Sequence, residues 1–124
     1  MEKLSLPLSI SNLIKTLESQ AFFNPSEITT LLDKAAIKSK DLEAWAKFDH
    51  PIEEGYGRAL VHAGENFEVM VMSWNPRDQT AVHNHGYTTW GAVQVFGNLD
   101  HTSFNCQDNF LYTLYKEKLT KGEI

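Results

Sequence analysis

The sequence of 124 residues contains a single cysteine, Cys106, and no proline after Pro76. One cysteine cannot form an intrachain disulfide, which indicates a reducing compartment, and we expect a cytoplasmic protein. No apolar run reaches membrane-spanning length and no N-terminal apolar segment is typical of a secretory signal, so we expect no membrane partner. Basic residues number 11 against 16 acidic ones and are not clustered, which argues against a nucleic-acid partner.

Apolar residues recur with a helical period in residues 8 to 48. A first stripe has the spacing of one helix face. It consists of Ile10, Leu13, Ile14, Leu17 and Ala21. The run Asn24-Pro25-Ser26-Glu27 has a capping residue, a first-turn proline and an acid three residues after the cap, which predicts the start of a second helix. A third, shorter helix is expected over Asp41 to Phe48, burying Leu42 and Trp45.

The hydrophobic period changes to two after the break at His50-Pro51. Six segments alternate apolar and polar residues in the way that is typical of strands. They are Tyr56–Ala63, Phe67–Trp74, Thr80–His85, Thr88–Phe96, Leu99–Phe104 and Phe110–Lys118. We therefore expect one mainly β domain over residues 1–124, in which a helical segment (8–48) precedes a jelly-roll type antiparallel β-barrel (55–124).

The pair His83 and His85 is the candidate metal site. Side chains two apart on a strand point to the same face, so two imidazoles would be presented together. Such a pair can supply two neighbouring ligands of an open coordination sphere suited to Fe, Ni, Cu or Zn. Taken alone, such a pair is more often two ordinary surface or core histidines than a metal site.

The spacing around this pair resembles the first sequence motif of the cupins. His83, His85 and Gly97 occupy the two histidine positions and the closing glycine of that motif, whereas Arg77 stands at its first glycine. Trp90 stands at the position of the metal-binding glutamate and cannot bind a metal. The resemblance therefore implies the cupin subfamily with an all-histidine iron site, the thiol dioxygenases.

Four segments in the same order are similar to cysteine dioxygenase. They are Leu42–Asp49, the strand Tyr56–Val61, the pair Ser73-Trp74 and the turn Gly97–Leu99. The resemblance implies an iron-dependent cupin enzyme that oxidises L-cysteine with O2 to cysteine sulfinic acid, with Fe(II) as its cofactor and cysteine and O2 as its small-molecule partners. The position of Cys106 does not match the cysteine–tyrosine cross-link of some relatives, and we expect a plain strand residue there.

The resemblance also assigns substrate roles to Arg58 and Tyr56. The family's arginine at this position binds the substrate carboxylate, and its tyrosine lines the same pocket. The residues agree with these roles, because Tyr56 and Arg58 share one face of the predicted strand and a guanidinium suits bidentate carboxylate binding. Without the resemblance, a solvated or salt-bridged strand residue would be the favoured interpretation of Arg58. We expect His62 on the same face as Arg58.

The second cupin motif supplies the last histidine ligand and requires a proline. Because the sequence has no proline after Pro76, we expect that the chain stops before this motif, near Gly122, and that the barrel is incomplete. An unpaired strand edge would then favour self-association. We expect little turnover from the chain alone. The alternative hypotheses are a non-catalytic cupin fragment or small-molecule binding module, and a cupin enzyme of another chemistry.

Overall fold

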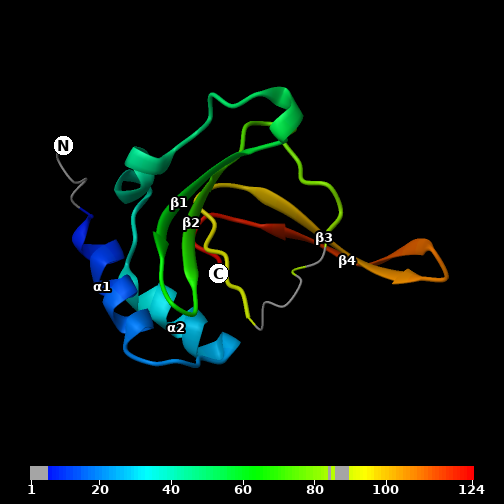
Figure 1. Cartoon of the computed structure of the whole chain (residues 1–124). Coiled ribbons are helices and arrows are strands. Elements are labelled where there is room, and N and C mark those ends of the chain that lie inside the picture. The colour runs from blue at the N-terminus through cyan, green and yellow to red at the C-terminus, as the bar shows by residue number, and fades with distance from the viewer. Residues whose placement is uncertain (1–5, 84, 86–89) are drawn as a thin grey trace.

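The structure, a computed structural model, describes residues 6–83, 85 and 90–124. The chain begins with two α-helices and two short 3-10 helices and continues with two antiparallel strand pairs (Figure 1). The elements are α1 (Leu8–Glu18), α2 (Pro25–Ala35), η1 (Ser39–Trp45), η2 (Ile52–Glu54), β1 (Gly57–Ala63), β2 (Glu68–Ser73), β3 (Leu99–Gln107) and β4 (Phe110–Leu119). No helix among the described residues is long and apolar enough to cross a membrane.

Helix α1 forms as its apolar spacing predicts. Four members of the stripe are buried, whereas the fifth, Ala21, lies beyond the end of the helix and is exposed. Leu13 and Leu17 form a buried cluster with Ile28 of α2. Residues from β2 and from the segment after the histidine pair, Val69 and Trp90 among them, pack against this cluster. The helical segment therefore provides the main core of the molecule.

Helix α2 begins with the capping box that the sequence predicts. The side chain of Asn24 accepts a hydrogen bond from the backbone N–H of Glu27 at 2.8 Å, and the Glu27 carboxylate accepts one from the Asn24 N–H at 3.2 Å. Pro25 occupies the first turn, where its missing N–H costs nothing.

The third predicted helix is a 3-10 helix that begins earlier and ends earlier than predicted. The Asp41 carboxylate accepts hydrogen bonds from the backbone N–H of Lys38 and from the Ser9 hydroxyl, each at 3.0 Å. These two hydrogen bonds, with the Lys38 N–H as the larger cause, lower the pKa of Asp41. They fix the start of η1 near Ser39 and join it to α1, while Trp45 ends the helix half-buried.

Strands β1 and β2 form a sheet with one covered and one open face. Gly57 and Ala59 lie opposite Ser73 and Val71, and all four are buried. The Lys47 N–H donates to the Ser73 hydroxyl at 2.9 Å, so the segment after η1 covers this face. Figure 1 shows both α-helices on the same side of the sheet.

A β-bulge interrupts the register between Leu60 and His62. Beyond the bulge His62 lies on the covered face, where its Nε2 lies 2.9 Å from the carboxylate of Glu18 at the end of α1. The expectation that His62 shares the face of Arg58 is therefore wrong, because one extra residue moves the following side chains to the opposite face.

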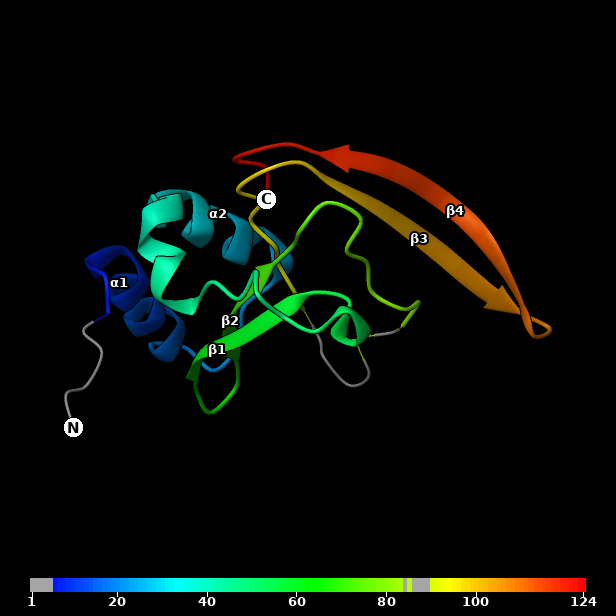
Figure 2. The same ribbon diagram turned by 90° about the horizontal axis from the view of Figure 1, so that it is seen from above.

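Strands β3 and β4 pair over their whole length and form a long hairpin. The hairpin extends away from the helices and from β1–β2 (Figure 2). Both of its strands were predicted, and β3 extends three residues further than expected. Its exposed large apolar side chains are Phe104, Phe110, Leu111, Tyr112, Leu114 and Tyr115. Self-association through an unpaired edge stays a prediction.

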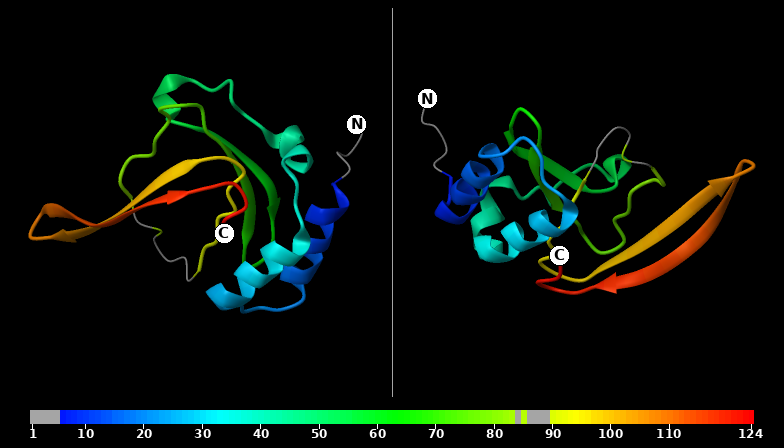
Figure 3. Two further views of the ribbon diagram at one scale, coloured as in Figure 1. Left: turned by 180° about the vertical axis from the view of Figure 1, so that it is seen from behind. Right: turned by 90° about the horizontal axis from the view of Figure 1, so that it is seen from below.

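The described residues do not form a closed barrel, because two of the predicted strands are not strands. Residues 80–83 and 85 have irregular backbone, and so do residues 90–96. Val95 makes two backbone hydrogen bonds with the C-terminal segment, from its N–H to Glu123 at 2.9 Å and from the N–H of Gly122 at 2.7 Å. Figure 3 shows this C-terminal segment beside the segment that contains Val95. These two hydrogen bonds join the segments but do not make them a pair of β-strands. The rest of the predicted strand 88–96 and Asn84 lie outside the described residues.

Candidate metal centre

His83 and His85 lie close together in space although their segment is not a strand. Their ring centroids are 5.3 Å apart and their ring planes are inclined by 75°. Both side chains are exposed. The expected pairing of the two imidazoles therefore does not depend on strand geometry.

The hydrogen bonding of His83 determines which ring nitrogen is available. Its Nδ1 lies 2.8 Å from the carbonyl oxygen of Ala81, which can only accept a hydrogen bond. Nδ1 therefore carries the proton of the neutral ring, and Nε2 keeps a lone pair. Metal-binding histidines typically have this arrangement, in which a carbonyl or carboxylate fixes the tautomer.

The separation of the two rings matches what one shared ion requires. With a metal–nitrogen bond of about 2.1 Å, each ring centroid lies about 3.3 Å from the ion, and ligand angles of about 90° to 110° separate the centroids by about 4.7 to 5.4 Å. The observed 5.3 Å lies within this range. An edge-to-face contact between two rings without a metal has a similar separation, so a metal titration decides between the two.

Arg58 lies on the open face of the β1–β2 sheet and is exposed. Its Nη2 donates to the Sδ atom of Met70 at 3.4 Å, and a thioether is a weak acceptor. No carboxylate among the described residues lies within ion-pair distance of this guanidinium. Most of its donors are therefore available for an acidic ligand.

Tyr56 immediately precedes β1 and stacks on Trp74, which immediately follows β2. The ring centroids are 4.4 Å apart and the planes differ by 12°. Tyr56 and Arg58 flank the buried Gly57 in the sequence, but Tyr56 lies in a bend before β1, so strand alternation does not place it and the shared face stays a prediction. The structure thus brings Tyr56 together with Trp74 and His83 together with His85. No hydrogen bond or ring contact between described residues joins the two pairs.

Comparison with known protein families identifies a match. The family described as cysteine dioxygenase type I matches residues 2–122. This match covers nearly the whole chain.

The chain belongs to the cysteine dioxygenase type I family. It is thereby a member of a family of oxidoreductases of the dioxygenase kind. No curated protein and no solved structure gives a significant match.

A metal site in a cysteine dioxygenase family member requires a group of side chains with metal-binding atoms. Among residues 6–83, 85 and 90–124, no group of three or more histidine, cysteine, aspartate or glutamate side chains could hold a metal ion. His83 and His85 form a group of two, and their role as metal ligands stays a prediction. His101, by contrast, pairs through Nδ1 with the carboxylate of Glu117 across the hairpin at 2.8 Å.

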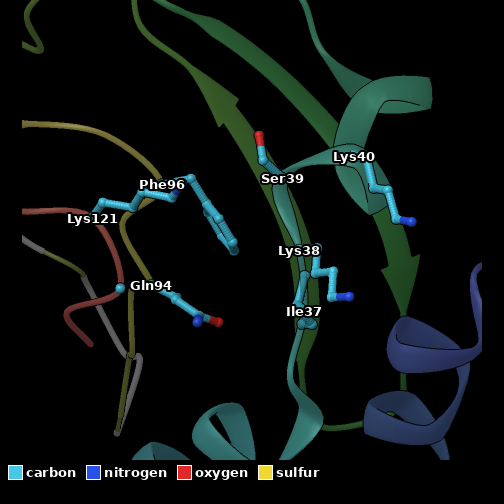
Figure 4. A pocket seen from close by; sticks show the side chains of 8 residues that line it. Ile37, Lys38, Ser39, Lys40, Gln94, Phe96 and Lys121 are labelled. Atoms are coloured by element: carbon cyan, nitrogen blue, oxygen red, sulfur yellow. The ribbon is translucent and has the colours of Figure 1, made fainter.

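A cavity of about 400 Å³ lies between the segment before η1 and the segment that contains Val95. None of the candidate site residues Tyr56, Arg58, His83 and His85 lines it. It is lined by Ile37, Lys38, Ser39, Lys40, Gln94, Phe96, Lys121 and Gly122. Figure 4 shows Gln94 and Phe96 pointing toward Ile37, while the side chains of Lys38 and Lys40 point away from them. The amines of Lys38 and Lys40 therefore do not converge on the cavity, and Lys121 is its one remaining lysine.

One partly buried polar cluster of this family member was not predicted from the sequence. His50 Nε2 lies 2.7 Å from Asp78 Oδ2, and the exposed fractions of the two side chains are 5% and 17%. Hydrogen bonds to the Pro51 carbonyl and to Asp78 raise the pKa of His50. Hydrogen bonds from the Asn75 N–H and from His50 lower the pKa of Asp78. The sequence has polar breaks at His50-Pro51 and at Asn75-Pro76, but no local pattern indicates that these two segments contact each other.

Proposed function

We propose that this chain is an iron-dependent thiol dioxygenase that oxidises L-cysteine to cysteine sulfinic acid. His83 and His85 would be two of the ligands of Fe(II), and Tyr56 and Arg58 would bind the substrate. Both atoms of O2 pass to the sulfur, so the reaction needs no external reductant. Membership of the family supports the reaction class.

The observation that supports the proposal best is the imidazole pair. Two rings 5.3 Å apart, one with its Nε2 lone pair fixed by the bond from Nδ1 to Ala81, suit one shared ion. Bound Fe(II) supplies the redox chemistry that makes O2 reactive toward a thiolate. The two imidazoles would hold this ion as neutral rings, which requires that the ligating nitrogen of each ring carries no proton.

Arg58 and Tyr56 supply recognition of the amino acid. The guanidinium of Arg58 can bind a carboxylate through two parallel hydrogen bonds. The stacked rings of Tyr56 and Trp74 form a flat apolar wall, which limits the positions open to a small substrate. A substrate with both a thiol and a carboxylate, such as cysteine, matches this set of groups.

A metal titration tests the ligand assignment. Calorimetry with anaerobic Fe(II) is expected to give one ion per chain, and His83→Ala and His85→Ala are each expected to weaken binding at least tenfold. His101→Ala is the control, because His101 is also exposed and paired with Glu117. Equal affinity in all four proteins would refute the assignment.

A comparison of two thiols tests the role of Arg58. The variant Arg58→Gln is expected to weaken binding of L-cysteine to the iron-loaded chain by about 10- to 100-fold, the range for a lost charged hydrogen-bonded pair. Binding of cysteamine, which has no carboxylate, should not change. Arg77→Gln is the matched control. An equal loss for both thiols would show that Arg58 does not read the carboxylate. Sulfinate formation, measured by mass spectrometry, tests turnover, which is expected to be low for the chain alone because no third ligand joins His83 and His85 among the described residues.

A further inference from the structure

We propose that His50 and Asp78 form a clamp that positions the segment bearing His83 and His85 for metal binding. The two are positioning residues, since neither is proposed to touch the ion or the substrate. The inference rests on the proposed function, because it assigns a role relative to the same imidazole pair.

The clamp joins two segments that are distant in the sequence. The segment from Lys47 to Gly55 runs along the segment from Ser73 to Gln79. The Asn75 side chain donates to the carbonyl of Phe48 at 2.7 Å, two residues before His50. At the far end, Gly55 has φ +76°, and a Cβ placed there would lie 2.4 Å from the carbonyl oxygen of Gln79. The two backbones are therefore in direct contact at this point.

His50 and Asp78 lie at the centre of this contact. His50 Nδ1 lies 2.9 Å from the Pro51 carbonyl and His50 Nε2 lies 2.7 Å from Asp78 Oδ2. Both ring nitrogens thus face acceptors, which only a doubly protonated ring satisfies by donating twice. The same Asp78 oxygen also accepts the N–H of Asn75 at 2.8 Å. The groups that act electrostatically on His50 are the carboxylates of Asp78 and Glu54.

The position of the clamp in the chain suggests its role. The contacts end at Gln79, four residues before His83, and the described residues between them have no strand or helix to hold them. On the other side, Trp90 and Ala92 pack against the core cluster of the helices. The histidine pair thus lies between two parts of the chain that are held by contacts, one ending at Gln79 and one beginning at Trp90. The partly buried His50–Asp78 pair belongs to the first of these contacts.

The test uses the full chain and two readouts. The variants are His50→Ala, Asp78→Ala and the double variant, with His101→Ala and Glu117→Ala as controls, because that pair has the same chemistry at 2.8 Å on the distant hairpin. Amide hydrogen exchange of the metal-free chain should become at least tenfold faster at residues 75–83 and stay unchanged in β1. Fe(II) affinity should fall about tenfold, the lower end for changes beyond the ligands themselves. The double variant should match each single variant, because the two act as one unit.

Several outcomes would overturn the proposal. Faster exchange throughout the molecule would mean a general structural role rather than positioning. Local loosening without a change in Fe(II) affinity would refute this inference and leave the proposed function intact, whereas no metal binding by the unaltered chain would refute both. If the alanine variants do not fold, the isosteric Asp78→Asn variant decides by the same two readouts.

Discussion

Replacement of Leu17 by alanine tests whether the helical segment is the main source of stability. Leu17 of α1 is 5% exposed and belongs to the cluster with Leu13 and Ile28. The substitution removes three carbons, worth about 2.4 kcal/mol in transfer at about 0.8 kcal/mol each. The cavity left behind adds to this loss, so the free energy of unfolding should fall by about 3 to 4 kcal/mol. That is a large fraction of the stability of a domain of this size.

Leu8→Ala is the matched control, since it is the same substitution in the same helix at a position that is 73% exposed. It should change the free energy of unfolding by less than about 0.5 kcal/mol. Urea unfolding followed by circular dichroism measures both variants. With a slope of about 2 kcal/mol per molar, the midpoint of Leu17→Ala should fall by about 1.5 to 2 M.

A loss below about 1 kcal/mol for Leu17→Ala would refute the reasoning, because a buried leucine side chain cannot be removed from a packed core so cheaply. Trp90 packs against the same cluster and follows the histidine pair in the sequence. Leu17→Ala should therefore also lower Fe(II) affinity under conditions where the variant is folded, although Leu17 itself has no metal-binding atom.

Three further predictions address a cap, a pH dependence and a thiol. Asn24→Ala should lower the free energy of unfolding by about 1 kcal/mol because it removes the cap of α2, whereas Asn24→Asp should retain it, as urea unfolding will show. The pKa of His50 is raised above its ordinary value of 6.5, so the stability that His50 contributes is complete below pH 6.5 and is lost as the pH rises through the folded pKa. The pKa of Asp78 is lowered below 3.8, so the stability that Asp78 contributes is complete above pH 3.8 and is lost as the pH falls through the folded pKa. The difference in unfolding free energy between the unaltered chain and His50→Gln should thus be largest between these two values, and a difference that grows at alkaline pH would contradict the assignment. Cys106 is exposed, so one thiol per chain should react with a disulfide reagent under native conditions, and its labelling should leave Fe(II) affinity unchanged.

The sequence predicts the elements whose signals are local. Three such features form: helix α1, which buries four of its five predicted stripe residues, the capping box at Asn24, and the antiparallel pairs β1–β2 and β3–β4. In each of these, the residues that define the element also satisfy its hydrogen bonds or bury its apolar face. The stretch over Thr80–His85 alternates in the same way, but a strand also needs a partner, and alternation alone does not provide one.

The candidate site is predictable as a set of residue types but not as a geometry. His83 and His85 were expected together because of strand alternation, whereas the structure brings them within 5.3 Å in an irregular segment. The His50–Asp78 contact depends on how two loops 28 residues apart meet, and no local pattern encodes such a meeting. The bulge after Leu60 likewise leaves no mark in the sequence, and it places His62 beside Glu18.

This bulge lets one strand serve two different surfaces. Before it, β1 directs Arg58 to the open face, and after it the strand directs His62 to the helices. In a strand of the same length without the bulge, simple alternation would put His62 on the face of Arg58, whereas deletion of Val61 would leave His62 directly after Leu60 and on the covered face. Relatives that lack the bulge in a strand of the same length would therefore present a different side chain beside Arg58, although the residues of the strand stayed the same.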